Sequence, residues 1–210
     1  MTVPSRAADV PARGEHPAID LVNTVFVRGG RRGRLVDSLA GPGRLGAWLD
    51  EHAAVLGLSA PSTVDEGPEG ERALASFVAL RDALRRIATA AVAGTEAAPE
   101  DVAAVNGAAR ATADWVELPP AGYGPPVHRT DAADPVRAAH SRVARAAVGL
   151  LTGPDRELLR SCPAPGCVRF YLRTHPRRAW CSTACGNRVR VARHGRASGG
   201  PRPSDPSPGR

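Results

Sequence analysis

Residues 162–188 read CPAPGCVRFYLRTHPRRAWCSTACGNR, and this stretch contains all four cysteines of the chain. Four residues separate Cys162 from Cys167, three separate Cys181 from Cys185, and thirteen lie between the two pairs. Two cysteines about two to four residues apart can bind one ion from a single tight turn, and structural zinc takes four such ligands at tetrahedral corners. The spacing therefore predicts one closed, structural Zn²⁺ site.

Two other interpretations of the cysteines stay open, namely a pair of disulfides and a thiol switch that releases zinc on oxidation. His175 lies between the pairs and could replace one cysteine as a ligand. We favour zinc on four cysteines because the sequence resembles that of a cytoplasmic protein, in which thiols stay reduced. Met1–Pro17 lacks the apolar core of a signal peptide, and no stretch approaches the ~20 apolar residues of a membrane span.

The local sequence predicts how the two cysteine pairs are presented. Prolines and a glycine between Cys162 and Cys167 favour a bent knuckle. Alternating apolar and polar residues over 168–172 predict a strand, and a returning strand is expected to end near Trp180. Residues 186–196 are compatible with a short helix. A knuckle, a hairpin and two ligands at a helix start make a treble-clef-like finger.

Such a finger needs its metal in order to fold. About 35 residues cannot bury enough apolar surface alone, so zinc binding would contribute folding free energy directly. We expect Phe170 and Trp180 to form a miniature core, and Gly186 to let the backbone approach the zinc sulfurs.

The charge of +7 is concentrated around this segment. Residues 160–210 contain 11 arginines and a single acid, Asp205, whereas residues 1–159 contain 17 arginines and 20 acids. Such asymmetry indicates a polyanionic partner, with a solubilising tail as the simpler alternative. Arginine suits phosphate because its planar fork donates two hydrogen bonds at once. The predicted nucleic-acid contacts are Arg177, Arg178, Asn187, Arg188, Arg190 and Arg193.

Two of these residues have structural alternatives. Asn187 could cap the helix or bond a ligand sulfur instead of reading a base, and Arg188 could pair with an acid of the N-terminal body. The arginines as a group could also only neutralise phosphates, which gives affinity without sequence choice.

The preceding residues predict a mainly helical domain. The hydrophobic content of 42% supports a core of ordinary size. Apolar spacing predicts helices from Pro17 to about Gly29, from Pro42 to about Gly57, over 70–93, from Pro99, and over 135–152. The apolar face of the first comprises Ala18, Leu21, Val22, Val25 and Phe26, and that of the second comprises Leu45, Trp48, Leu49 and His52.

Some finer expectations follow from the same patterns. On the third predicted helix, Arg81 and its charged neighbours should lie mostly on the face opposite the apolar stripe. On the fourth, Val102 and Val105 should point inward. Two short strands with a loop are expected in residues 114–130. Asp20, Asn23 and Thr24 lie opposite the apolar face of the first helix, where they could line a small-ligand pocket, be solvated, or bond the local backbone.

The tetrapeptide Cys185-Gly186-Asn187-Arg188, with Trp180-Cys181 before it and a basic run after it, resembles the CGNR zinc finger. His16-Pro17-Ala18-Ile19-Asp20-Leu21-Val22-Asn23-Thr24 resembles the opening of the ABATE domain that usually accompanies this finger, and residues 45–49 resemble its second helix. The resemblance implies a stress-induced transcriptional regulator of bacteria.

Together these features predict an α+β protein with four parts. They are a disordered arm over 1–15, an ABATE-like helical domain with a small hairpin over 16–153, a treble-clef-like CGNR finger over 154–196, and a disordered tail over 197–210.

The leading functional hypothesis is a DNA-binding regulator whose N-terminal domain senses a small effector or forms a homodimer. The alternative is a zinc-stabilised module that docks on an acidic protein without reading DNA. An enzyme is not expected, because the chain has no phosphate loop, nucleophile elbow or His-Glu zinc helix.

Overall fold

The computed structural model describes residues 16–30, 33–58 and 63–197. The arm predicted over 1–15, and all but the first residue of the tail predicted over 197–210, lie outside the described residues.

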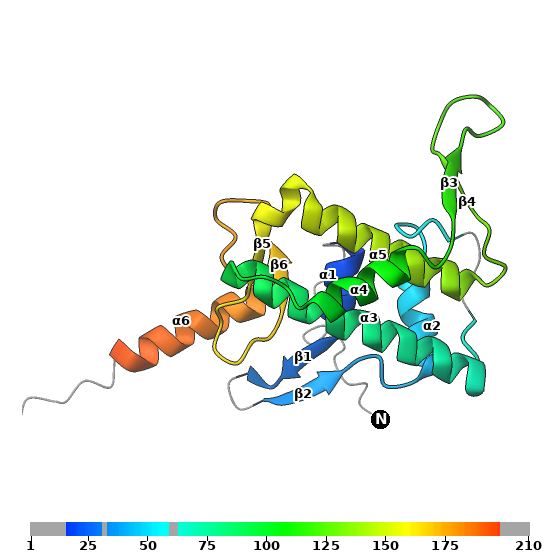
Figure 1. Ribbon diagram of the computed structural model, residues 1–210. Coiled ribbons are helices and arrows are strands. Elements are labelled where there is room, and N and C mark those ends of the chain that lie inside the picture. The colour runs from blue at the N-terminus through cyan, green and yellow to red at the C-terminus, as the bar shows by residue number, and fades with distance from the viewer. Residues whose placement is uncertain (1–15, 31–32, 59–62, 198–210) are drawn as a thin grey trace, which may run out of the picture.

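Five helices build the body of the molecule (Figure 1). The two longest, α3 and α5, pack against each other, α1 packs on both of them, and α4 lies along both. Each helix begins with proline in its first turn, where the missing N–H costs no hydrogen bond. The helices are α1 (Pro17–Val22), α2 (Pro42–Glu51), α3 (Pro68–Ala93), α4 (Pro99–Ala109) and α5 (Pro135–Thr152).

The sequence placed most of these helices correctly. Gly94 ends α3 in the left-handed conformation, with φ of 71°, and Asp134 caps α5 by accepting a hydrogen bond from the N–H of Val136. The inner face predicted for α2 is buried, including His52, whose ring stacks on that of Trp48.

The first helix is shorter than predicted. Helix α1 ends at Val22, and Val25 and Phe26, which were expected on its apolar face, belong to strand β1 (Val25–Arg28). Strand β1 pairs antiparallel with β2 (Arg34–Asp37). Alternating Val25-Phe26-Val27 before a glycine-rich turn is a hairpin pattern, and cross-strand pairing outweighs the helical spacing here.

Two side chains differ from the prediction in their exposure to solvent. Arg81 is only 4% exposed, because Asp37 and Asp82 both accept hydrogen bonds from its guanidinium. Val102 on α4 is exposed, whereas Val105 is buried as predicted.

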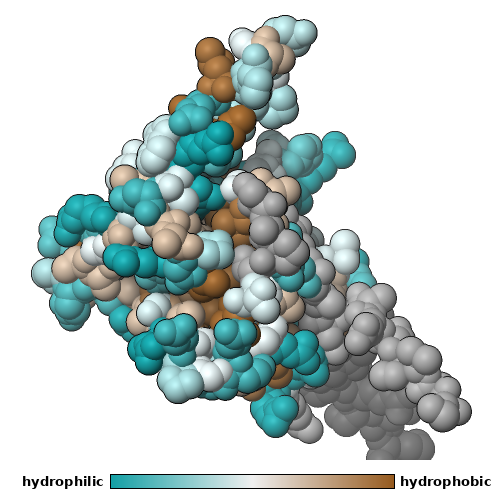
Figure 2. Space-filling view, turned by 90° about the vertical axis from the view of Figure 1, so that its right-hand side faces the viewer, coloured by the Kyte–Doolittle hydropathy of each residue, from teal (hydrophilic) through white to brown (hydrophobic). Residues whose placement is uncertain are grey.

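The hairpin predicted in residues 114–130 is present as strands β3 (Asp114–Glu117) and β4 (Val127–Thr130). It projects from the body (Figure 1), and Figure 2 shows hydrophobic side chains on this projection. Trp115, Val116, Leu118 and Tyr123 are all large and exposed.

After α5, a 3-10 turn η2 (Pro154–Leu158) leads into the cysteine-containing segment. Strand β5 (Leu159–Ser161) pairs antiparallel with β6 (Phe170–Leu172), and α6 (Thr183–Ala197) follows. The returning strand expected before Trp180 was wrong, since residues 173–182 form turns and loops. The partner of β6 instead precedes the first cysteine, so the knuckle itself connects the two strands.

The small β5–β6 hairpin belongs to two hydrophobic clusters at once. Leu159, Phe170 and Leu172 lie in the main helical core, whereas Tyr171 lies in a second cluster with the cysteines. Successive residues of a strand point to opposite faces, which separates Tyr171 from its neighbours. Phe170 is therefore not part of a miniature core of the finger, as predicted, but anchors the finger to the body.

Candidate metal centre and nucleic-acid interface

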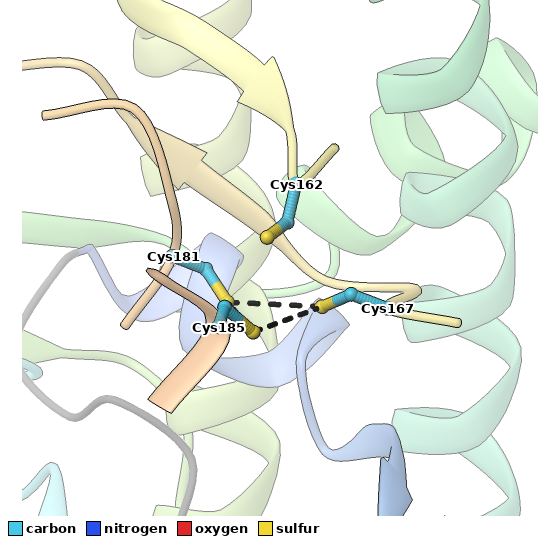
Figure 3. A group of neighbouring side chains, drawn as sticks. All are labelled: Cys162, Cys167, Cys181 and Cys185. Carbon is cyan, nitrogen blue, oxygen red and sulfur yellow. Dashed lines mark hydrogen bonds between the residues drawn. The ribbon is translucent and has the colours of Figure 1, made fainter. Parts of the chain in front are cut away.

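Two knuckle-like elements bring the cysteines together from separate parts of the segment (Figure 3). Cys162 directly follows β5 and Cys167 ends the turn before β6, where Gly166 has a φ of 72°. The N–H of Cys167 donates to the carbonyl of Ala164 at 2.9 Å and closes the turn. Cys181 precedes α6 and Cys185 lies in its first turn, as predicted for ligands at a helix start.

The sulfur atoms have the spacing of a tetrahedral site. Sγ of Cys181 lies 3.7 Å from Sγ of Cys167 and 3.5 Å from Sγ of Cys185, and the Cys185–Cys167 distance is 3.8 Å. All four sulfurs lie within 4.8 Å of one another. A regular tetrahedron with Zn–S bonds of about 2.3 Å has edges of about 3.8 Å. The four cysteines thus fit one structural zinc ion.

The alternatives to this ligand set are not supported. All four cysteines are free, and their sulfurs are far outside the ~2.05 Å of a disulfide bond. His175 is exposed outside the sulfur cluster, and its Nδ1 accepts a hydrogen bond from the N–H of Arg177 at 3.1 Å.

The close approach of the four sulfurs also favours a cation. Contacts with the sulfurs of Cys167 and Cys181 lower the pKa of Cys162 to about 6. Contacts with Cys162, Cys167 and Cys185 raise the pKa of Cys181. Sulfurs this close cannot all be thiolates without a positive charge between them, and a divalent metal supplies that charge.

Arg188 has a place in the metal centre. Its Nη2 lies 3.0 Å from Sγ of Cys185, and its Nη1 lies 3.4 Å from the carbonyl of Pro165. The suggested partnership with an acid of the N-terminal body was wrong. Arg188 instead joins a ligand sulfur on α6 to the first knuckle, which also leaves it poorly placed to bind a phosphate.

The tight approach at Gly186 involves an aromatic ring. A Cβ at this position would lie 3.1 Å from Cε3 of Trp180, which packs against the cysteine cluster. Gly186 thus lets Trp180 cover the start of α6, and this contact replaces the predicted role of letting the backbone approach the sulfurs.

Two other predicted DNA contacts make bonds inside the finger. Arg178 donates to the carbonyls of Leu172 and Cys181 and lies over the ring of Tyr171, so it supports the loop before α6. Asn187 is exposed and accepts a hydrogen bond from Arg190 through Oδ1, and no bond to a sulfur is seen for this described residue.

Arg177, Arg190 and Arg193 are exposed. Arg190 and Arg193 are three residues apart on α6, so they lie about 60° apart around the helix. No acid occurs between residues 158 and 204 of the sequence. These three arginines therefore form the accessible part of the predicted nucleic-acid interface.

The pocket predicted at Asp20, Asn23 and Thr24 does not fit the structure. All three residues are buried and bonded to protein groups. Oδ2 of Asp20 lies 3.2 Å from Nε2 of His52, and the Thr24 hydroxyl donates to the carbonyl of Leu21 at 2.7 Å. The bonds of these side chains go to protein groups, that of the Thr24 hydroxyl to the local backbone, although within the described residues no hydrogen bond reaches the buried Oδ1 of Asp20.

Asn23 instead holds the finger on the body. Its Nδ2 donates to the carbonyl of Phe170 at 2.8 Å, and its Oδ1 accepts from the N–H of the same residue at 2.9 Å. Arg85 makes a parallel link, because it donates to the carbonyls of Val22 and Val168. No local sequence pattern indicates these links, since each joins positions far apart in the chain.

Comparison with protein families agrees with the two-part organisation. A family model named ABATE, described as "Putative stress-induced transcription regulator", matches residues 15–154. A second model, the CGNR zinc finger, matches residues 159–197. A comparison with curated proteins found no match.

Proposed function

Because the chain belongs to the ABATE family and ends in a CGNR zinc finger, we propose that it is a transcriptional regulator that binds DNA through this finger. The observation that carries the proposal is the exposed set Arg177, Arg190 and Arg193 next to a metal-fixed scaffold in a stretch without acids. Arginines on such a surface bind phosphates and release counterions. A cytoplasmic location follows from this proposal.

The test is a salt titration of DNA binding with the zinc-loaded protein. The logarithm of affinity for a random duplex should fall linearly with the logarithm of salt concentration, by about 0.9 for each phosphate contact. The double variant Arg190→Ala/Arg193→Ala should lower the slope by about two units and keep its zinc. Arg44→Ala/Arg110→Ala, which removes two exposed arginines from α2 and the end of α4, is the matched control.

No DNA binding at low salt would contradict the proposal and leave docking on an acidic protein as the function to pursue. Loss of zinc from the Arg190/Arg193 variant would instead show that these arginines belong to the scaffold.

We assign the metal a structural role and no catalytic one. Four protein sulfurs fill the tetrahedral sites of zinc, whereas catalytic zinc keeps a position for water or substrate. Among the described residues, no helix has the length and hydrophobicity needed to cross a membrane.

For the sensing role of the N-terminal domain, we propose an effector site at a different location from the one predicted at Asp20, Asn23 and Thr24. A hollow of about 590 Å³ opens between α3 and the start of α5, with Phe77, Ser76, Arg137 and His140 on its walls. Glu69 and Asp134 also line it, so the walls offer partners to both acceptor and donor groups of a small organic effector. An effector found by thermal shift should stabilise the wild type but not Ser76→Trp, which places an indole in the hollow. Equal stabilisation of both would contradict this location.

Homodimerisation is the other role proposed for the N-terminal domain, and the β3–β4 projection is the surface we assign to it. Leu118 and Tyr123 are 77% and 80% exposed, and Figure 2 shows this hydrophobic surface standing clear of the body. Sedimentation analysis should find a dimer for the wild type and a monomer for Leu118→Asp. A monomeric wild type would rule the dimer out.

A further inference from the structure

The β1–β2 hairpin is a second basic element, outside the predicted nucleic-acid interface. Arg28 and Arg34 lie on its two strands and are exposed. Residues 26–36 contain no acid. The acid of the hairpin, Asp37 at its base, accepts hydrogen bonds from Arg81, so the end of the hairpin near its turn is basic like the finger surface.

The structure places this hairpin beside the start of α6 (Figure 1). A Cβ on Gly30, at the hairpin turn, would lie 3.7 Å from Cδ of Arg188. Lower on the hairpin, the guanidinium of Arg169 lies 4.7 Å from the centre of the Phe26 ring. Asn23, just before β1, is bonded to Phe170 of the finger. The hairpin therefore contacts the finger from its base to its turn, and the turn lies next to Arg188 of α6.

The pairing of the strands puts like charges together. Arg28 is directly opposite Arg34 in the register of the hairpin. Like charges at such positions destabilise a strand pair. A polyanion bound across the two arginines would remove this repulsion.

We propose that the β1–β2 hairpin is a second DNA-contacting element, in which Arg28 and Arg34 bind phosphates in addition to those bound by α6. This inference rests on the proposed DNA-binding function and extends it. The N-terminal domain contributes directly to DNA affinity, and the contact surface continues from the finger across the domain boundary.

The experiment compares the zinc-loaded, full-length wild type with Arg34→Gln in the same salt titration. The variant should have a slope lower by about 0.9 and bind about five-fold more weakly at ~0.15 M salt, as expected for one lost phosphate contact. Its melting temperature should be unchanged or higher, because the repulsion with Arg28 is gone. Arg34→Lys should keep the wild-type slope, and Arg44→Gln on α2, at the end of the molecule away from α6, should keep both slope and affinity.

The outcomes separate this inference from the function on which it rests. If the wild type binds DNA and Arg190→Ala/Arg193→Ala weakens binding, but Arg34→Gln behaves as Arg44→Gln does, the hairpin inference is overturned and the proposed function stands. Equal losses in Arg34→Gln and Arg34→Lys would also overturn it, because the effect would not depend on charge. A wild type that does not bind DNA overturns both.

Discussion

The helical body and the cysteine finger reach stability by different means, although they share a hairpin. Among the described residues, the main core contains 25 buried hydrophobic residues, whereas the finger cluster contains five, three of which are cysteines. The body is held by apolar burial, which scales with the area removed from water. The finger has too little such area, so the metal replaces a core. The β5–β6 hairpin contributes residues to both clusters, so it joins the part stabilised by apolar burial to the part stabilised by the metal.

Loss of the metal should produce the largest difference between the finger and the body. Cys185→Ser should abolish stoichiometric zinc and unfold the knuckles and α6, because structural zinc contributes on the order of 10 kcal/mol in zinc-finger peptides. Helices α3 and α5 should stay folded on their own core. Metal analysis and hydrogen exchange measure the two effects, with Ser161→Ala, next to Cys162, as the control. Full protection of α6 in the zinc-free variant would contradict this division.

Adjacent residues of β6 allow the two clusters to be tested separately. Phe170→Ala removes a ring from the main core and should lower the free energy of unfolding by about 3–5 kcal/mol. Tyr171→Ala opens the cysteine cluster and should weaken zinc binding while the melting of the helical body changes less. Thermal unfolding and a competitive zinc titration should rank the two variants in opposite orders. The same order in both assays would mean that the clusters are not distinct.

Arg188 sharpens the boundary between scaffold and contact surface. Arg188→Ala should weaken zinc binding by about 10–100-fold, the usual effect of losing a bond to a metal ligand. Arg190→Ala, two residues further along α6, should leave zinc affinity unchanged. Competition with a chelator of known affinity measures both constants, and equal affinities in the two variants would remove Arg188 from the metal centre.

The smallest expected effect concerns acid sensitivity of the body. Burial lowers the pKa of His140 below its usual 6.5, against the opposing hydrogen bond to the carbonyl of Ser76. Below pH 6.5 the unfolded chain therefore binds a proton more readily than the folded one. The contribution of His140 to the free energy of unfolding is complete above pH 6.5 and is lost as the pH falls through the lower, folded pKa. His140→Gln should flatten the dependence of melting temperature on pH between 7.5 and 5.5. Parallel curves for variant and wild type would contradict this assignment.

The sequence predicted features that depend on near neighbours. The four cysteines, the proline starts of the helices and the left-handed Gly94 each follow from residues a few positions apart. The same approach misplaced Val25 and Phe26, because their spacing fits a helix as well as a strand. Only pairing with β2 distinguishes the two, although the glycine-rich turn between alternating residues was a usable signal.

The roles of individual arginines could not be predicted, because composition does not specify contacts. Arg188 and Arg178 look like Arg190 and Arg193 in the sequence, yet the first two bond a ligand sulfur and backbone carbonyls. Arg81 likewise reads as a surface residue until Asp37 is placed beside it by the hairpin. For the same reason, Asn23 resembled a pocket residue until its partner was found 147 positions along the chain.

That separation has a consequence for synthesis of the protein. At about 5–20 residues per second, Phe170 is added roughly 7–30 s after Asn23. Throughout that interval the nascent N-terminal segment lacks the backbone partner that satisfies its buried amide. The body is therefore completed only after residue 170 has been added, and a chain that stops before that residue should be a substrate for chaperones and proteases.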